Sequence, residues 1–360
     1  MKRYYFIVGE ASGDLHAANL IKELSLLDPS ATFQGFGGER MEKEGLQLTK
    51  HYQEMAYMGF WEVLINLNAI RKNFKQAKKE LIEYKTDVLV LVDYPGFNLR
   101  MATFAKKHNI KVVYYITPQV WAWKESRVKK LKRDVDLLLP ILPFERSFFA
   151  KHGIDVNYVG HPLLDAFKDL DSRKIESEKP IIAILPGSRK QEIATSLPIM
   201  MEVAKSFENY QFIIAGAPSI SQDFYRHITQ HSYMPILSNQ THALLKECKA
   251  AIVTSGTATL EAAILKVPQV VCYKTSSISY FLAKLVVKVK YIALVNLICD
   301  KEVVKELIQN DFNVDNLVNE LNRILNKKNK TQIHSDYERM IGLIGDDGAS
   351  QRAAQAINLI

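Results

Sequence analysis

Short apolar segments alternate with longer amphipathic segments along most of the chain, and this alternation restricts the fold more than any other feature. Apolar segments rich in β-branched residues, such as Val88–Val92 and Ile181–Leu185, predict strands that are buried on both faces. The predicted strands are Tyr4–Val8, Thr32–Gly35, Val88–Val92, Lys111–Ile116, Leu137–Pro140, Ile181–Leu185, Gln211–Ala215, Ala251–Thr254 and Gln269–Tyr273. The predicted helices are Leu15–Leu27, Trp61–Glu83, Arg100–Lys107, Glu145–His152, Ile193–Phe207, Thr241–Cys248, Ala258–Leu265, Ile278–Val287 and a helical tail from Val314 onward. This order predicts an α/β fold with parallel sheets covered by helices on both faces.

The length of the chain and one charged segment predict two domains. A chain of 360 residues is too long for one ordinary hydrophobic core. The segment Asp165–Lys179 is charged, lacks periodicity and is followed by Pro180, which is typical of a linker. We expect one Rossmann-like domain over residues 1–167 and a second over 168–345, with their sheets facing each other across a cleft. A helix over 346–360 is expected to pack back on the first domain or on a partner chain.

The composition indicates a globular protein with a basic surface. The net charge of +8 favours phosphorylated ligands, anionic lipid or nucleic acid, although a lysine-rich surface without such a partner explains it equally well. No RNA-binding or DNA-reading motif is present, which argues against nucleic acid. The apolar segment Tyr4–Val8 is too short for a signal peptide and no segment is long enough for a membrane span, so we expect a cytoplasmic protein.

Cysteines and histidines are scattered, which predicts neither disulfides nor a metal site. The two histidines closest to candidate loops are interpreted as isolated structural residues. The residues concerned are Cys248, Cys272, Cys299, His16 and His161.

The segments that follow the predicted strands are rich in glycine, hydroxyl and charged residues. Ligands of open α/β sheets bind at the carboxyl ends of the strands, so these segments are candidate binding loops. They are Gly9–Asp14, Gly35–Met41, Asp93–Asn98, Thr117–Trp123, Pro186–Arg189, Gly216–Pro218 and the residues after Val253. A structural turn needs only one or two such residues, so their repetition at successive strand ends predicts a ligand site.

Two of these loops precede helices and have the composition of a diphosphate site. Ser255, Gly256 and Thr257 offer hydroxyls and backbone amides at a helix N-terminus, although on these residues alone N-capping is the simpler explanation. Arg189 is expected in the first turn of its helix, where a cation opposes the helix dipole. Its position is favourable if it faces a phosphate or, alternatively, if it pairs with Glu192.

Acidic residues next to these loops are candidate ligands or bases. Glu261 could accept hydrogen bonds from ribose hydroxyls, or could simply favour the first turn of its helix. Asp93 follows a buried strand, where desolvation can tune a carboxylate as a base; an Asx-turn is the structural alternative. Asn98 could orient a substrate. The loop Gly9–Asp14 lacks the GxGxxG pattern, which argues against a nicotinamide oxidoreductase.

One predicted helix combines an apolar stripe with a basic end. The residues of the stripe are Phe60, Trp61, Val63, Leu64 and Leu67. Basic residues follow between Arg71 and Lys79, so the helix either docks on anionic lipid or packs in the core with a solvated basic end. A second basic and apolar segment, Tyr280–Tyr291, favours the membrane surface.

Motifs occur in a characteristic order over almost the whole chain. They are VGEASGD (Val8–Asp14), GFGGERM (Gly35–Met41), MGFWEVL (Met58–Leu64), DYPGFN (Asp93–Asn98), PQVWAW (Pro118–Trp123), LPFE (Leu142–Glu145), VGHPLLD (Val159–Asp165), LPGSRKQEI (Leu185–Ile193), SGTATLEAA (Ser255–Ala263), NLICDKEVVKELIQ (Asn296–Gln309) and GASQRAA (Gly348–Ala354). PGSR and SGTATLE also occur in related sugar-nucleotide enzymes, whereas GEASGD together with PQVWAW is highly specific. In these motifs the chain resembles the lipid-A-disaccharide synthases, a family of GT-B glycosyltransferases of Gram-negative bacteria.

The resemblance implies a hexosyltransferase that joins two acylated sugars. The donor would be UDP-2,3-diacylglucosamine, the acceptor 2,3-diacylglucosamine 1-phosphate (lipid X), and the products a β-1,6-linked disaccharide 1-phosphate and UDP. An α-linked donor and a β-linked product imply inversion in a single displacement, for which Asp93 matches the acidic position of the family. No metal or cofactor is implied, so Arg189, helix N-termini and hydroxyl groups would stabilise the departing diphosphate. The enzyme would work at the anionic inner face of the inner membrane, and a homodimer is expected.

The motifs and the resemblance together give the expected site. Catalytic residues are Asp93 and Arg189. Donor-binding residues are Gly187, Ser188, Arg189, Gly216, Tyr273, Ser255, Gly256, Thr257, Thr259, Glu261, Asn296 and Glu302, the last as a ligand of the uridine ribose. Acceptor-binding residues are Gly9, Glu10, Ser12, Gly13, Asp14, Met58, Asn98, Gln119, Trp121 and Trp123. Membrane-contacting residues are Phe60, Trp61, Val63, Leu64 and Leu67.

Two departures from the family pattern and two alternatives remain. Lys305 stands where the family often has proline, and Gly96 stands where some members have a second aspartate, which leaves Asp93 as the base. One alternative is another GT-B enzyme, such as the N-acetylglucosaminyl transferase of peptidoglycan synthesis or a UDP-sugar 2-epimerase. The other is a lipid-associated nucleotide-binding protein without catalytic activity.

Overall fold

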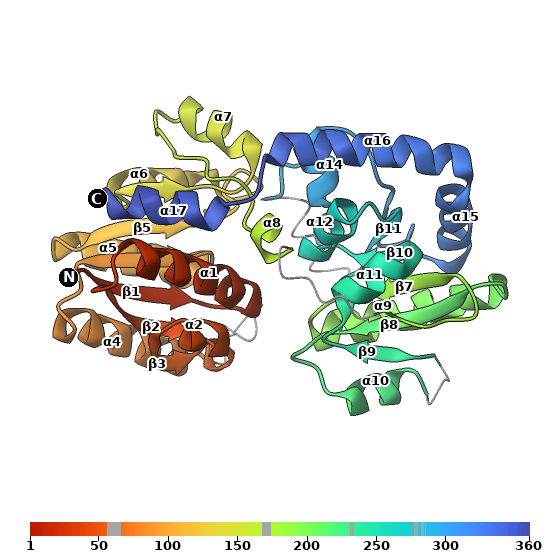
Figure 1. Ribbon diagram of the computed structural model, residues 1–360, viewed down its shortest axis with the longest axis horizontal. Helices are drawn as coiled ribbons and strands as arrows, with labels where there is room; N and C mark the ends of the chain where they lie inside the picture. Colours follow the sequence, from red (N-terminus) through yellow and green to blue (C-terminus); the bar gives the residue numbers. More distant parts are fainter. Residues whose placement is uncertain (56–65, 168–173, 231–233, 277–279, 282–283, 285) are drawn as a thin grey trace. The chain divides into compact units, whose positions relative to one another are not determined.

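The computed structural model describes residues 1–55, 66–167, 174–230, 234–276, 280–281, 284 and 286–360 (Figure 1). Contacts divide the chain into two compact units. The first comprises Met1–Lys168 and Gly345–Ile360, and the second comprises Asp169–Ile344. In the described residues, no helix is both long enough and apolar enough to cross a membrane.

The described strands of the first unit form a six-stranded parallel sheet in the order β3-β2-β1-β4-β5-β6. They are β1 Arg3–Val8, β2 Thr32–Gly37, β3 Leu46–His51, β4 Val88–Val92, β5 Lys111–Tyr115 and β6 Leu137–Leu139. The helices are α1 Ala11–Leu27, α2 Glu39–Lys43, α4 Leu67–Glu83, α5 Pro95–Lys107, α6 Val128–Asp134, α7 Pro143–Lys151, α8 Leu163–Ala166 and α17 Ala349–Asn358, with 3₁₀ turns η1 Tyr52–Glu54 and η2 Glu125–Arg127.

Alternate residues of β1 serve two separate cores, because side chains alternate between the faces of a strand. Tyr4, Phe6 and Val8 pack with apolar residues of α1 and α17. Tyr5 and Ile7 pack on the other face with residues of α4, α5, α6 and α7. An apolar strand that is buried on both faces is what the sequence predicts for a parallel sheet.

The second unit repeats this architecture with the strand order β12-β11-β10-β7-β8-β9. The strands are β7 Ile181–Leu185, β8 Gln211–Gly216, β9 Ile236–Ser238, β10 Cys248–Thr254, β11 Gln269–Tyr273 and β12 Glu306–Ile308, all paired in parallel. The helices are α9 Lys190–Glu202, α10 Gln222–Ile228, α11 Thr241–Glu247, α12 Thr257–Ile264, α14 Leu294–Cys299, α15 Val314–Leu325 and α16 Lys327–Ile344, with a 3₁₀ turn η3 Val203–Ser206.

The predicted parallel α/β fold and the helical tail are confirmed, and the differences are local. Strands β3, β9 and β12 were not predicted. The predicted helix Ile193–Phe207 is α9 followed by η3, and α5 begins at Pro95 rather than Arg100. Most of the predicted helix Ile278–Val287 and the start of Trp61–Glu83 lie outside the described residues.

The C-terminal helix α17 packs against α1 of its own chain (Figure 1). Ala353, Ala354 and Ile357 are fully buried in this contact. The Asp165 carboxylate accepts hydrogen bonds from the N–H groups of Gly348 (2.5 Å) and Ser350 (2.7 Å), and so caps the start of the helix. The end of the chain is therefore built into the first unit.

Candidate functional site

Adjacent strands bring three of the expected loops to one edge of the first sheet. Strand β4 pairs with β1 on one side and with β5 on the other. The segments Gly9–Asp14, Asp93–Asn98 and Thr117–Trp123 leave the carboxyl ends of these strands. Parallel sheets bind ligands at this edge.

Asp93 lies at the centre of this edge in a strained backbone conformation. Asp93 and Tyr94 both have positive φ, 44° and 48°, which costs a non-glycine residue about 1–3 kcal/mol and is common at functional sites. The carbonyl oxygen of Asp93 accepts hydrogen bonds from the Tyr114 hydroxyl (2.6 Å) and the Asn98 amide (2.7 Å). These contacts hold the strained turn, and Asp93 as a residue is partly exposed.

The surroundings of Asp93 raise the pKa of its carboxyl group to a value that suits a base near neutral pH. Burial, the charge of Glu10 and then the charge of Glu145 raise the pKa of Asp93 to about 7. Glu10 itself accepts a hydrogen bond from the Ser12 hydroxyl (2.7 Å). A group with a pKa near the working pH is the most effective general base.

Glu145 is a buried carboxylate for which the sequence analysis assigned no role. One of its oxygens accepts hydrogen bonds from the Thr117 hydroxyl (2.8 Å) and the Trp121 indole N–H (3.2 Å). The other accepts from the main-chain N–H groups of Ile141 (3.1 Å) and Leu142 (2.9 Å). Burial raises the pKa of Glu145 to about 7 despite these bonds. Its place in the first turn of α7 signals helix capping, but nothing local signals the contact with Trp121.

Several expected acceptor ligands form hydrogen bonds or close contacts within the fold. The carboxylate of buried Asp14 accepts hydrogen bonds from two N–H groups at the start of α2 (3.2 and 3.3 Å). Asn98 is fully buried, and its amide donates to three main-chain carbonyls at the ends of β1 and β4 (2.7–3.4 Å). At Gly9, an added Cβ would lie 2.4 Å from the Tyr94 ring, so this glycine is required by packing. These bonds give Asp14 and Asn98 structural roles, and their expected contacts with the acceptor stay predictions.

The remaining expected acceptor and membrane residues fall into three groups. Gln119 and Trp123 are exposed, and Trp121 packs edge-on against Phe144 (4.8 Å between ring centroids). Gly13 is buried in α1. Leu67, the first residue of α4, is 40% exposed. Outside the described residues lie Met58, Phe60, Trp61, Val63 and Leu64.

In the second unit, two helices begin at the carboxyl edge of the sheet without a side-chain cap. Helix α9 starts after Arg189 and α12 after Gly256, and in neither case does a described side chain accept a hydrogen bond from the helix N-terminus. Ser255 does not cap; its hydroxyl donates to the carbonyl oxygen of Ile292 (3.1 Å). Uncapped N-terminal amides are suited to an anion, so the capping alternative does not explain this loop.

The loop Pro186–Arg189 packs closely on the end of β10. Gly187 has a φ of 110°, and a Cβ there would lie 2.8 Å from Oε2 of Glu192. Arg189 pairs with Glu192 (2.8 Å), as the alternative interpretation expects, and it is the N-cap of α9 rather than part of its first turn. Burial and the charge of Glu192 raise the pKa of Tyr273, whereas the charge of Arg189 lowers it. Tyr273, at the end of β11, therefore lies within reach of the Arg189–Glu192 pair. Ser188 is exposed next to them.

Residues around α12 complete this edge. Nε2 of His242 lies 3.1 Å from Oε2 of Glu261, and the side chain of Glu261 is 18% exposed. Thr257 is the first residue of α12, and the hydroxyl of buried Thr259 donates to the Gly256 carbonyl (2.8 Å). Gly216, the last residue of β8, is buried.

Two expected donor ligands lie elsewhere in the second unit. Asn296 is fully buried; its oxygen accepts from the N–H groups of Val303 and Val304 (2.8 and 3.0 Å), and its amide donates to Glu306 (2.8 Å). These bonds use both ends of the amide and argue against the expected contact of Asn296 with the donor, which stays a prediction. Glu302 precedes β12 and pairs with Lys305 (3.4 Å), so it lies toward the amino edge of the sheet. Of the two expected ribose ligands, the geometry favours Glu261.

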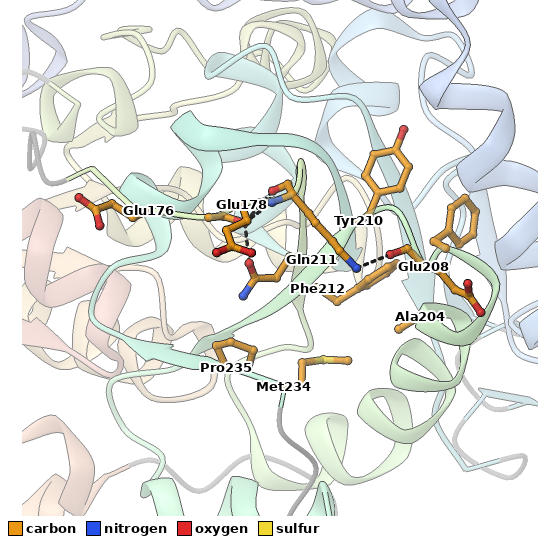
Figure 2. Close-up of a pocket in the computed structure, with 12 residues that line it drawn as sticks. Glu176, Glu178, Ala204, Glu208, Tyr210, Gln211, Phe212, Met234 and Pro235 are labelled. Carbon is orange, nitrogen blue, oxygen red and sulfur yellow. Dashed lines mark hydrogen bonds between the residues drawn. The ribbon is translucent and has the colours of Figure 1, made fainter.

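A cavity of 960 Å³ in the second unit is unrelated to these loops (Figure 2). Its lining includes Lys179 and Gln211, which lie at the starts of β7 and β8, and Pro235, which precedes β9. The Lys179 ammonium donates a hydrogen bond to the Glu208 carbonyl (2.7 Å). This is the amino edge, opposite the edge at which parallel sheets bind ligands.

The two histidines interpreted as isolated are in fact near each other. Burial lowers the pKa of His16 to about 4, and burial together with the charge of His16 lowers the pKa of His161 to about 3. Nδ1 of His161 accepts a hydrogen bond from the N–H group of Leu163 (3.2 Å). No group of histidine, cysteine, aspartate and glutamate suited to a metal ion occurs in the described part of the chain.

Comparisons with known proteins agree on one family. A family model described as lipid-A-disaccharide synthetase matches residues 4–360. The lipid-A-disaccharide synthase of Trichlorobacter lovleyi is 36% identical over 98% of this chain and 96% of its own length. That of Syntrophus aciditrophicus is also 36% identical, over 100% of this chain and 98% of its own length.

Solved structures with low sequence identity share the fold. A putative UDP-N-acetylglucosamine 2-epimerase from Listeria monocytogenes has a TM-score of 0.72 at 12% identity, over 99% of this chain and 96% of that chain. The calicheamicin glycosyltransferase CalG4 has a TM-score of 0.64 at 14% identity, over 100% of this chain and 98% of that chain. These likenesses confirm the predicted GT-B fold. The chain belongs to the lipid-A-disaccharide synthases, a family of hexosyltransferases that act in lipid A synthesis.

Proposed function

We propose that this chain transfers 2,3-diacylglucosamine from UDP to the 6-hydroxyl of 2,3-diacylglucosamine 1-phosphate (lipid X), with inversion at the anomeric carbon. The products are the β-1,6-linked disaccharide 1-phosphate and UDP. Family membership supports the reaction class. The observation that carries the proposal is the partly exposed Asp93, whose pKa of about 7 suits a base at the carboxyl edge of the first sheet.

In the proposed reaction, Asp93 removes the proton of the acceptor 6-hydroxyl. The oxygen attacks the anomeric carbon of the donor, the bond from that carbon to the diphosphate oxygen breaks, and its electron pair leaves with UDP. A single displacement of this kind inverts the anomeric centre. The strained turn at Asp93 and Tyr94, fixed through Tyr114, supports this role because a base must be held in place before the substrate arrives.

The departing diphosphate is proposed to bind at the second unit. Uncapped N-termini of α9 and α12 provide backbone N–H groups, and Arg189 provides a positive charge. Glu192, which pairs with Arg189, would exchange this contact for the phosphate. Glu261 is proposed to accept hydrogen bonds from the ribose, with Tyr273 beside the diphosphate. Preorganised donors of this kind stabilise developing negative charge.

The protein is further proposed to act at the anionic inner face of the inner membrane, where acylated substrates reside. Exposed Leu67 and the basic residues of α4 support this location. The homodimer expected from the sequence stays a prediction, which the molecular mass in solution tests.

The proposed function is tested by mass spectrometry of products from detergent-dispersed lipid X and UDP-2,3-diacylglucosamine, with EDTA present. We expect disaccharide and UDP from the wild type and none from Asp93→Ala. Turnover by Asp93→Ala would remove Asp93 as the base. If the folded wild type makes no product, the synthase assignment is refuted. Incubation with UDP-N-acetylglucosamine would then test for 2-epimerase activity. This is the first alternative because a putative epimerase from Listeria monocytogenes shares the fold.

A further inference from the structure

Two cations stack on the Trp123 ring at the carboxyl edge of the first sheet. Nζ of Lys124 lies 4.7 Å and Cζ of Arg127 lies 4.9 Å from the centroid of this ring. Both distances are within the range of cation–π attraction. Because like charges repel, gathering two cations on one ring is unfavourable unless an anion neutralises them.

Within the described residues, neither the Lys124 ammonium nor the Arg127 guanidinium forms an ion pair with a carboxylate. Glu125, the acid between them in sequence, directs its Oε1 to Nε2 of His152 (3.2 Å). The Arg127 guanidinium has no ion pair or hydrogen bond to a described residue, and its partial burial lowers the pKa of Arg127. The guanidinium therefore presents unpaired N–H donors that have already lost part of their hydration.

The backbone at Lys124 is also strained. Its φ of 56° and ψ of 47° place it in the left-handed region. Lysine has no conformational reason to adopt this region, and such residues cluster where a ligand is bound. The strain supports a role for the Lys124 side chain in binding.

Arg127 is linked to the proposed base through one side chain. The charge of Arg127 lowers the pKa of Tyr114, and the Tyr114 hydroxyl donates to the carbonyl of Asp93 at 2.6 Å. In a hexopyranose 1-phosphate, C1 with its phosphate and C5 with its hydroxymethyl group flank the ring oxygen. A group that binds this phosphate must therefore stand within about one sugar of the base. Arg127 and Asp93 both interact with Tyr114, which supports such a placement.

We propose that Arg127 and Lys124, stacked on Trp123, bind the phosphate monoester of the sugar acceptor and select acceptors that carry it. This proposal rests on the proposed function, which supplies a phosphorylated acceptor. A guanidinium binds phosphate through two parallel hydrogen bonds, and an ammonium adds a mobile point charge. A lipid headgroup offers the same phosphate, but a partly buried arginine that interacts with the same tyrosine as the base fits the acceptor.

The test compares lipid X with the same acylated sugar lacking its phosphate. We expect Arg127→Ala to raise the KM for lipid X by about 10- to 100-fold, because this is the effect of losing one charge-assisted hydrogen bond. The KM for the donor should not change. The KM for the acceptor without phosphate should not change. Lys130→Ala removes an equal charge from an exposed position on α6 and serves as the matched control. An equal loss with both acceptors, or an equal effect of Lys130→Ala, would overturn the proposal.

A binding measurement separates this proposal from the proposed function. Glucosamine 1-phosphate should change the tryptophan fluorescence of the wild type, glucosamine should not, and the change should vanish in Trp123→Phe and Arg127→Ala. If wild type makes no disaccharide, the synthase assignment fails while this titration still decides the phosphate site. Retained phosphate binding by Arg127→Ala, with weaker sedimentation on phosphatidylglycerol vesicles, would assign the cations to lipid headgroups and refute the proposal.

Discussion

Replacing Asp93 by asparagine should stabilise the first unit at neutral pH while it abolishes catalysis. Asparagine tolerates positive φ as well as aspartate does, so the strained turn is preserved. The pKa of Asp93 is raised from 3.8 to about 7. The folded state therefore holds a proton that the unfolded state releases between these pH values, and the free energy of unfolding falls as the pH rises through this window.

The shift sets the size of the effect. At 1.36 kcal/mol per pKa unit, the upper limit is about 4 kcal/mol above pH 7. Because Asp93 is only partly buried as a residue, solvent screens part of this effect, and we expect a gain of about 1–2 kcal/mol for Asp93→Asn at pH 8. Below pH 4 both states hold the proton and the gain should disappear.

Tryptophan fluorescence during urea unfolding measures this gain, because the three tryptophans, at positions 61, 121 and 123, all belong to the first unit. The exposed Asp155, changed to asparagine in the same unit, is the control and should show no comparable pH dependence. If Asp93→Asn is no more stable than wild type at pH 8, or if its gain in stability does not change with pH, then burial and neighbouring acids do not raise the pKa of Asp93 in the folded state.

Two further predictions concern residues whose roles the structure defines. In Glu145→Gln, an uncharged amide faces the Trp121 indole N–H, so a charged hydrogen bond is lost and kcat/KM should fall about 10-fold. The acid limb of the pH profile should also move to lower pH, because the charge of Glu145 that raises the pKa of Asp93 is gone. An unmoved limb would mean that Glu145 has only a structural role. Asn296→Ala should lower the free energy of unfolding of the second unit by about 2–4 kcal/mol, measured by circular dichroism, because buried main-chain groups lose their partners. UDP affinity of the folded variant, measured by calorimetry, should not change; a lost affinity would restore Asn296 as a donor ligand.

The central strands could be predicted from the sequence because they are apolar on both faces. Val88–Val92 and Ile181–Leu185 have the bounds that their patterns predict. Strand β3, with the sequence LQLTKH, has only one fully buried residue, and β9 and β12 are three residues long. Edge strands of this kind lack the periodicity and the length on which sequence interpretation depends.

The candidate loops could be recognised from composition, but the roles of their polar residues could not. Asp14, Asn98 and Asn296 bond mainly to main-chain groups, and a buried polar residue of this kind has the same sequence signature as one that faces a ligand. Glu145 and Arg127 reach the site only through the packing of α7 and η2 against the sheet edge, which no local motif encodes. The helix α5 begins early because a two-residue turn with positive φ delivers Pro95 directly to its first position.

The burial of α17 against α1 has a consequence for biosynthesis. A nascent chain emerges from its N-terminus, so α1 is made long before Ala353, Ala354 and Ile357 exist to cover it. The second unit is continuous in sequence and can complete its core first. During synthesis, the apolar face of α1 stays uncovered until α17 has left the ribosome. Chaperone dependence and sensitivity to truncation before α17 should therefore concentrate in the unit that is synthesised first.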